Sequence, residues 1–138
     1  MTWIMSNKIL AYTMFRLFLG LNMFMHGAVR LGPNYQQFIA WTQSVFAETW
    51  LPEWLVTLEA RLIPGVEIII GVLLILGFKT RLAVILAFGL LATLVFGMNV
   101  VQDWELVSRH VIYVIAFYLL MHNMEFNEYS IDARRSSS

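Results

Sequence analysis

Cysteine is absent from this chain of 138 residues. Its absence excludes disulfide bonds, thiolate catalysis and cysteine-ligated iron–sulfur clusters. It also excludes redox chemistry that passes through a pair of thiols. Any redox role would therefore require a bound redox-active molecule or cofactor.

Charged residues are also scarce, at 13% of the chain against about 25% in soluble domains. Hydrophobic residues make up 59%, the formal net charge is zero, and no block of lysine and arginine occurs. Because a basic patch is the electrostatic footprint of nucleic-acid binding, we expect no nucleic-acid partner. The composition is typical of an integral membrane protein with one domain. We therefore expect the lipid bilayer to be one of its partners.

Four apolar segments have a length close to the roughly 20 residues that an α-helix needs to cross a bilayer. They are residues 9–29, 55–78, 82–98 and 105–122. We therefore expect an all-α integral membrane protein, a four-transmembrane-helix bundle built by residues 1–123. A polar cytoplasmic tail, 124–138, should add nothing to the fold.

Small residues indicate where the helices pack closely. Gly89, Thr93 and Gly97 recur every four positions in the third segment and predict a close-packed seam there. Gly20 and Gly27 in the first segment and Gly71 in the second are further candidates for such contacts.

The connection from residue 32 to residue 54 is the only long one. Apolar residues recur in it at three-to-four spacing, which predicts a short amphipathic interfacial helix between the first two transmembrane helices. This helix either anchors the protein against the bilayer or covers a cavity as a lid. The residues on its apolar face are Tyr35, Phe38, Ile39, Thr42, Val45 and Phe46, and the tryptophans expected in the outer aromatic belt are Trp41, Trp50, Trp54 and Trp104.

Basic residues beside the apolar segments predict the orientation in the membrane. Arg30 and Arg61 fall among acidic residues on one side. Five basic residues fall on the other side, so both termini should be cytoplasmic in a bacterial or archaeal cytoplasmic membrane. These five are Lys8, Lys79, Arg81, Arg134 and Arg135.

Charged side chains inside apolar segments are costly, at roughly 2.5 to 3.5 kcal/mol each on insertion scales, so they should face partners and not lipid. With about 1.5 Å of rise per residue, five polar groups lie in one band about 16 to 24 Å above the inner ends of the helices. Arg16 lies lower, at about 9 Å. We expect a structural ion pair between Glu67 and either Arg109 or Arg16. The band contains Glu67, Asn22, His110, Arg109 and His26.

A carboxylate, an arginine and two imidazoles around one cavity, walled by aromatic rings, suit a quinone head group or another small polar ligand. The candidate catalytic residues are Glu67, His26 and His110. Alternatively, the ion pair is purely structural and backbone carbonyls satisfy both histidines. We expect no covalently bound cofactor, no metal site and no haem between the histidines. The candidate ligand-binding residues are Asn22, His26, Glu67, Arg109, His110 and Tyr113.

Several short motifs resemble those of the DoxX family of small membrane proteins. They are Arg16 to Gly20 (RLFLG), His26-Gly27 with Arg30-Leu31, Glu67 with Gly71, and Leu76-Gly77 with Thr80-Arg81. Arg30 departs from the pattern, because a lysine is usual there; the charge is kept but the hydrogen-bond geometry changes. The resemblance implies a four-helix bundle related to the membrane subunit of thiosulfate:quinone oxidoreductase, with quinone reduction as the suggested chemistry.

Three functions from different classes fit these features. The favoured one is a quinone-interacting subunit of a redox complex, not catalytic alone, that receives electrons from other membrane or periplasmic redox subunits. The second is a structural subunit of a larger membrane assembly. The third, a small transporter, is disfavoured because the chain lacks inverted repeats and a pair of broken helices. Polar groups on several helix faces also favour association with further copies of the chain.

Overall fold

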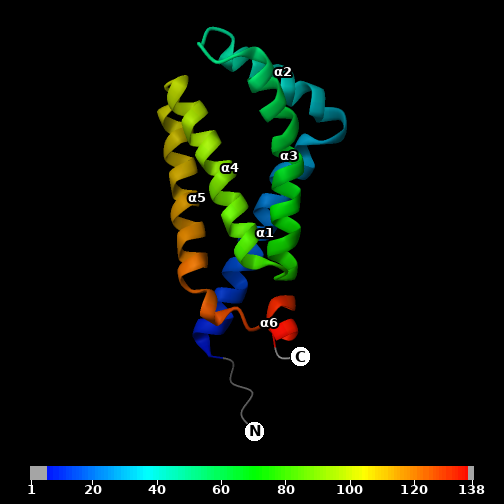
Figure 1. Cartoon of the computed structure of the whole chain (residues 1–138), viewed down its shortest axis with the longest axis vertical. Helices are drawn as coiled ribbons and strands as arrows, with labels where there is room; N and C mark the ends of the chain where they lie inside the picture. The colour runs from blue at the N-terminus through cyan, green and yellow to red at the C-terminus, as the bar shows by residue number, and fades with distance from the viewer. Residues whose placement is uncertain (1–5, 137–138) are drawn as a thin grey trace.

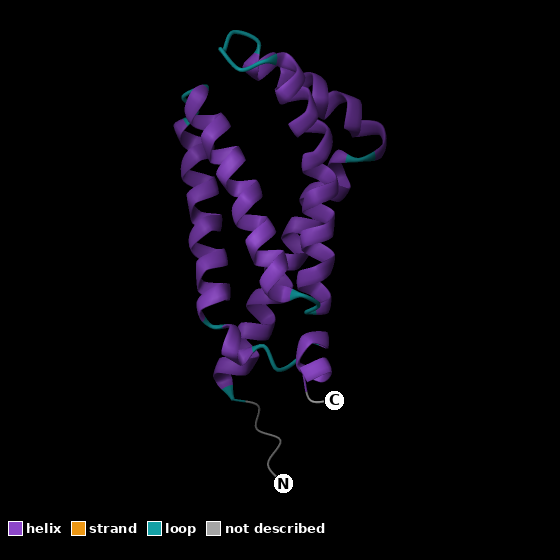
Figure 2. Cartoon of the chain, in the orientation of Figure 1, coloured by secondary structure: helices purple, strands orange, loops and turns teal. Residues whose placement is uncertain are grey.

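The computed structural model describes residues 6–136 and is entirely helical over that range (Figures 1 and 2). Four long helices run along the bundle, and the prediction of an all-α fold is confirmed. Short 3-10 turns follow the first and fifth helices, at Gly32–Asn34 and Met124–Phe126. The α-helices are α1 (Asn7–Arg30), α2 (Tyr35–Phe46), α3 (Glu53–Leu76), α4 (Thr80–Val100), α5 (Trp104–His122) and α6 (Ile131–Ser136).

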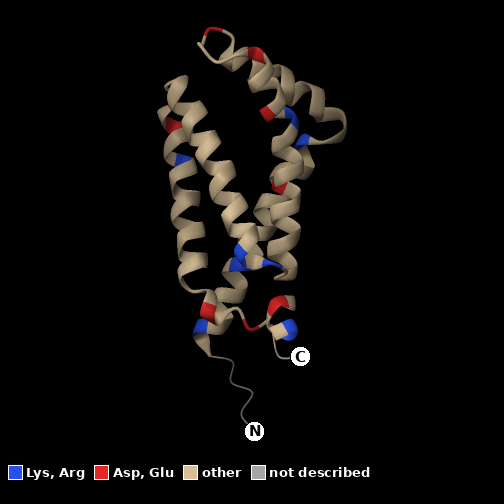
Figure 3. Ribbon diagram, viewed as in Figure 1, with Lys and Arg blue, Asp and Glu red and all other residues tan. Residues whose placement is uncertain are grey.

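Three of the predicted spans, α1, α4 and α5, are helices long and apolar enough to cross a membrane. Large apolar side chains on their outer faces, such as Phe18 and Ile112, are each 65% exposed, as lipid contact would require. The 24-residue α3 is not one of these three, because every 18-residue stretch of it contains the charged residues Glu59, Arg61 and Glu67. That α3 crosses the membrane as a fourth span stays a prediction. Charged side chains lie mainly toward the two ends of the bundle (Figure 3).

Close backbone contact joins α1 to α3 in antiparallel register. A Cβ atom added at Gly27 would lie 2.4 Å from the carbonyl oxygen of Pro64, and one at Gly71 would lie 2.4 Å from the backbone nitrogen of Phe24. Glycine at these two positions therefore lets the two helices approach. The seam predicted through Gly89 is wrong, since no atom lies within 4 Å of the Cβ position there.

The apolar core lies in the half of the bundle nearest the α3–α4 turn. Ile70 and Leu74 of α3 are fully buried, together with Ala83 and Ala87 of α4 and Phe117 of α5. Toward the other end, α3 and α4 diverge, and α2 lies beside α3 (Figure 1). Burial is therefore concentrated at one end, which leaves room for a cavity at the other.

A helix of 12 residues, α2, occupies the place where a short amphipathic helix was predicted. It is tied to α3 by two hydrogen bonds. The Tyr35 hydroxyl donates to the carbonyl oxygen of Arg61 at 3.0 Å, and the Gln43 amide donates to the Thr57 hydroxyl at 2.9 Å. That α2 lies at the membrane surface stays a prediction.

The C-terminal segment contributes to the fold, so the expectation that residues 124–138 add nothing to it was wrong; residues 137–138 lie outside the described residues. The Asp132 carboxylate accepts hydrogen bonds from the backbone N–H groups of Lys79 (2.7 Å) and Thr80 (2.8 Å) and from the Thr80 hydroxyl (2.8 Å). The Asp132 N–H donates to the carbonyl oxygen of Gly77 at 3.0 Å. The first N–H groups of α4 lack partners within the helix, and Asp132 supplies an acceptor with favourable charge.

Candidate ligand-binding site

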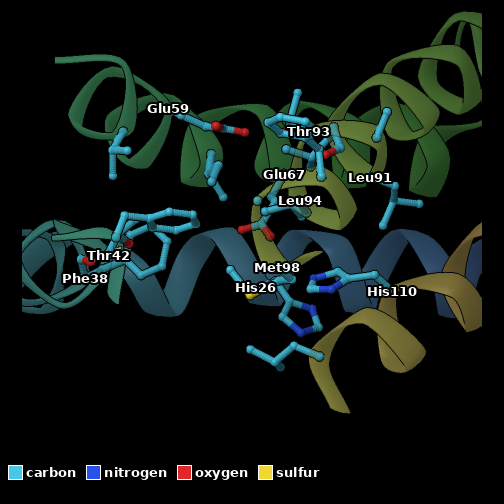
Figure 4. Close-up of a pocket in the computed structure, with 18 of the residues that line it drawn as sticks. His26, Phe38, Thr42, Glu59, Glu67, Leu91, Thr93, Leu94, Met98 and His110 are labelled. Carbon is cyan, nitrogen blue, oxygen red and sulfur yellow. Dashed lines mark hydrogen bonds between the residues drawn. The ribbon is translucent and has the colours of Figure 1, made fainter. Parts of the chain in front are cut away.

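A cavity of about 750 Å³ lies at the α2 end of the bundle, with walls from α1 to α5 (Figure 4). Most of its wall is apolar. From α2 the wall receives Phe38, Trp41, Thr42 and Phe46, so this helix forms part of the cavity wall. The anchor and lid alternatives for α2 both stay predictions. The remaining polar residues of the wall are His26, Arg30, Glu59, Glu67, Thr93, Arg109, His110 and Tyr113.

An ion pair between Arg30 and Glu67 lies in the cavity wall. The Arg30 Nη1 atom donates to both Glu67 carboxylate oxygens, at 2.5 and 2.6 Å. The Glu67 side chain is 5% exposed and the Arg30 side chain 30% exposed. The Arg30 guanidinium also stacks over the Phe38 ring, 4.8 Å from its centre. The pair thus links α1 to α3, and its arginine links both helices to α2.

The predicted pairing of Glu67 with Arg109 or Arg16 is wrong. Arg109 instead pairs with Glu105 one turn away on α5, at 2.5 Å, where both side chains are mostly exposed. Arg16, only 2% exposed, donates to the carbonyl oxygens of Leu74 (3.1 Å) and Tyr129 (2.7 Å). It therefore satisfies the carboxyl end of α3 and holds the C-terminal segment.

The register between α1 and α3 explains why Glu67 pairs with Arg30 and not with Arg16. Because Gly27 packs against Pro64 and Ile68, the last turn of α1 lies level with the middle of α3. The long Arg30 side chain then reaches Glu67. Arg16 lies about three turns before Gly27 on α1 and is therefore far from Glu67 along the contact between the two helices.

The two predicted histidines line the cavity in different hydrogen-bonding states. His26 Nδ1 lies 2.8 Å from the carbonyl oxygen of Asn22, which can only accept, so this nitrogen is the donor; in a neutral imidazole Nε2 then has a lone pair. The alternative in which backbone carbonyls satisfy the histidines therefore holds for one nitrogen of His26, the Nδ1 atom. In His110 the Nδ1 atom is buried without a hydrogen-bond partner among the described residues.

Asn22 and Tyr113 act together across α1 and α5. The Asn22 amide donates to the Tyr113 hydroxyl at 3.0 Å, and the Tyr113 ring packs edge-on against His26 with ring centres 6.2 Å apart. Because its oxygen accepts from Asn22, Tyr113 can donate its own proton into the cavity. Asn22 does not line the cavity, whereas the other five predicted ligand-binding residues do.

Glu59 and Arg30 are the charged wall residues that the sequence reasoning missed as site residues. Glu59, Ile63 and Glu67 follow one another at intervals of four on α3, and all three line the cavity. This spacing could have identified Glu59. Arg30 was assigned to the outer flank of the first span, although it stands within the motif that carries the family resemblance.

The cavity can hold a molecule with both a polar and an apolar part. Tyr113 can donate a hydrogen bond, while Glu59 and His26 Nε2 can accept one. Within the described residues no group of three or more histidine, aspartate or glutamate side chains is placed to hold a metal ion. The arrangement therefore favours hydrogen bonding and proton exchange with a small ligand.

Comparison with known proteins identifies the family. The DoxX family model matches residues 11–101, more than half of the 138-residue chain. The match includes Arg30, Glu59 and Glu67 and ends before α5, which carries His110 and Tyr113. Neither the curated proteins nor the solved structures contain a match. On the strength of the family match, the chain belongs to the DoxX family of membrane proteins.

Proposed function

We propose that the chain is a quinone-interacting subunit of a membrane redox complex and that the cavity binds the quinone head group. The observation that supports this most is a mainly apolar cavity of about 750 Å³ whose polar residues include a buried ion pair, two imidazoles and a phenol. A quinone carbonyl oxygen needs hydrogen-bond donors, and its reduction needs protons. The apolar wall suits the ring and the hydrocarbon chain.

In the proposed placement, α3 crosses the bilayer beside α1, α2 lies at the outer surface and both termini are cytoplasmic. Two features of α3 support this. Glu67 is buried and neutralised by Arg30, which lowers the cost of its charge at membrane depth. Arg61 is exposed two turns from the start of the helix, close enough to the surface for its charge to reach water.

The proposed subunit does not carry electrons alone. With no cysteine in the chain, electrons reach a bound quinone from a partner, a membrane or periplasmic redox subunit. The chain's own residues hold the head group and exchange protons with it. In the alternative function, a purely structural subunit, the Arg30–Glu67 ion pair serves only to hold α1 and α3 together.

A fluorescence titration tests the proposal. The purified protein in lipid nanodiscs is titrated with menadione while tryptophan emission is followed; Trp41 in the cavity wall is the local reporter. We expect saturable quenching that is weakened by His26→Ala and by His110→Ala. Each lost hydrogen bond should weaken binding by about 0.5 to 1.5 kcal/mol.

The matched control is His122→Ala, because His122 stacks on Tyr118 and lies outside the cavity. Menadione should quench the tryptophan emission of this variant to the same extent as that of the parent. Unchanged quenching in the double variant of His26 and His110 would place the quinone elsewhere. Complete absence of saturable quenching in the parent would favour the structural subunit.

A further inference from the structure

Among the described residues, Glu59 is the acidic residue of the cavity wall that makes no salt bridge. Its Oε1 atom is buried and has no hydrogen-bond partner among the described residues, whereas both oxygens of Glu67 are held by Arg30. Around Glu59 the wall is apolar, with Leu55, Val56 and Ile63 from the same helix. Buried polar atoms in folded proteins nearly always have a partner, so this oxygen is placed to accept a hydrogen bond from a ligand.

The spacing of Glu59 and Glu67 along α3 is comparable with the length of one aromatic ring and its hydrogen bonds. Glu59 precedes Glu67 by eight residues, or about 12 Å along the axis of α3. In Figure 4, Glu59 lies at one end of the cavity and His26 and His110 at the other, with Glu67 between them. A six-membered ring with an oxygen at each end, extended by a hydrogen bond of about 2.7 Å on each side, covers a comparable length.

The hydrogen-bonding character of the wall distinguishes the two redox forms of such a ring. An ionised carboxylate only accepts, and His26 Nε2 has a lone pair to accept with. A quinone carbonyl oxygen also only accepts, so it cannot satisfy Glu59. A hydroquinone hydroxyl donates to one group and still accepts from another, such as Tyr113.

We infer that Glu59 accepts a hydrogen bond from a hydroxyl of the reduced quinone, so that the cavity binds hydroquinone more tightly than quinone. This inference rests on the proposed function. It assigns Glu59 as a ligand-binding residue that determines which redox form is held. The preference is expected to be on the order of tenfold to hundredfold, the range for one hydrogen bond to a charged group.

Calorimetric titration of the full chain in nanodiscs, without oxygen, tests the inference. The probes are menadiol, menadione and the dimethyl ether of menadiol, which keeps the ring and the oxygens but has no hydroxyl to donate. Menadiol should bind most tightly to the parent, and the other two should bind at least about tenfold more weakly. Glu59→Leu should abolish the preference and leave menadione affinity within about twofold of the parent.

Glu59→Gln should keep a smaller preference, because its amide oxygen still accepts but carries no charge. Glu53→Gln, an exposed position on the same helix and outside the cavity, is the matched control and should behave as the parent. Melting temperatures establish that each variant is folded. Removing the Glu59 carboxylate, whose buried Oε1 atom has no hydrogen-bond partner among the described residues, should not lower them.

The outcomes separate this inference from the function on which it rests. Equal affinity of the parent for menadiol and menadione, or a preference that persists in Glu59→Leu, would overturn the role of Glu59 while leaving a quinone site. Failure of all three probes to bind the parent would overturn the proposed function itself. Tight binding of the dimethyl ether would show that ring shape, and not hydroxyl donation, decides affinity.

Discussion

A single nitrogen of Arg30 makes the ion pair with Glu67. Its Nη1 atom contacts both carboxylate oxygens, and no second guanidinium nitrogen contacts Glu67. A lysine ammonium can make the same contact, because it is a compact charge with three donors. Arginine at this position therefore keeps the interaction that the usual lysine of the resemblance would allow, and its planar group adds the stacking on Phe38.

Replacing Arg30 tests this view of the pair. Arg30→Met should lower the stability by about 3 kcal/mol, the low end of the range for a broken buried pair, because it leaves Glu67 uncompensated. Arg30→Lys should lose less than half of that. The double variant Arg30→Met with Glu67→Gln should recover much of the loss. Unfolding in detergent, followed by circular dichroism, measures these differences.

Arg109→Ala is the control for the pair. Its salt bridge with Glu105 is exposed on both sides, so its removal should change stability by less than about 1 kcal/mol. A loss in Arg109→Ala as large as in Arg30→Met would show that Arg109 also compensates a buried charge.

The short helix α6 makes a tertiary contact that a helix of its length would not be expected to make. This six-residue helix is held where α3 ends and α4 begins, through Asp132. Burial by itself would raise the pKa of the Asp132 carboxyl, but hydrogen bonds from Thr80 and Lys79, with the nearby Arg16 charge, lower this pKa below its ordinary value of 3.8. The segment before α6 is fixed as well, because Arg16 binds the Tyr129 carbonyl.

The lowered pKa gives a prediction with a definite sign. Because the folded-state pKa of Asp132 is below the unfolded value of 3.8, its stabilisation is complete above that pH and is lost as the pH falls through the folded value. Asp132→Asn should lower the stability at neutral pH by about 1 to 2 kcal/mol, as the loss of a helix cap does. The difference in melting temperature from the parent should shrink below pH 3.8. A difference that stays constant down to the acid limit would mean that the charge of Asp132 contributes nothing.

At the scale of the whole molecule, the bundle is tight at one end and hollow at the other. Apolar side chains and the Arg16–Asp132 region close the end where α6 lies, whereas the cavity occupies the α2 end. Both α6 and the beginning of α1 lie at the closed end (Figure 1). With the termini cytoplasmic, the cavity would therefore lie in the outer half of the membrane.

Single-cysteine labelling tests this orientation, and the absence of native cysteine makes it selective. Glu48 and Ser136 are exposed at opposite ends of the bundle. In intact cells, an impermeant maleimide should label Glu48→Cys and leave Ser136→Cys unlabelled until the cells are lysed. The reverse pattern would show that the protein has the opposite orientation in the membrane. Labelling of both cysteines in intact cells would show that the number of spans is odd.

Much of the fold follows from local sequence. Apolar segments of spanning length predicted the four long helices, and the spacing around Phe38 predicted a helix at α2. Hydropathy and periodicity are sufficient there, because each helix satisfies its own backbone hydrogen bonds. Matching depth also predicted that His26, Glu67 and His110 lie near one another, and all three line the cavity.

The sequence by itself determined the helical class, the family and the level at which polar groups meet. Only the tertiary structure decided that Glu67 pairs with Arg30, that the Glu59 Oε1 atom has no hydrogen-bond partner within the described residues, and that Asp132 holds α4. The reason is physical: depth along a helix follows from residue count, whereas the choice among arginines depends on how α1 slides and rotates against α3. That register is set by the glycine contacts between residues of α1 and α3 that are more than 30 positions apart in the chain, through van der Waals packing that no local pattern records.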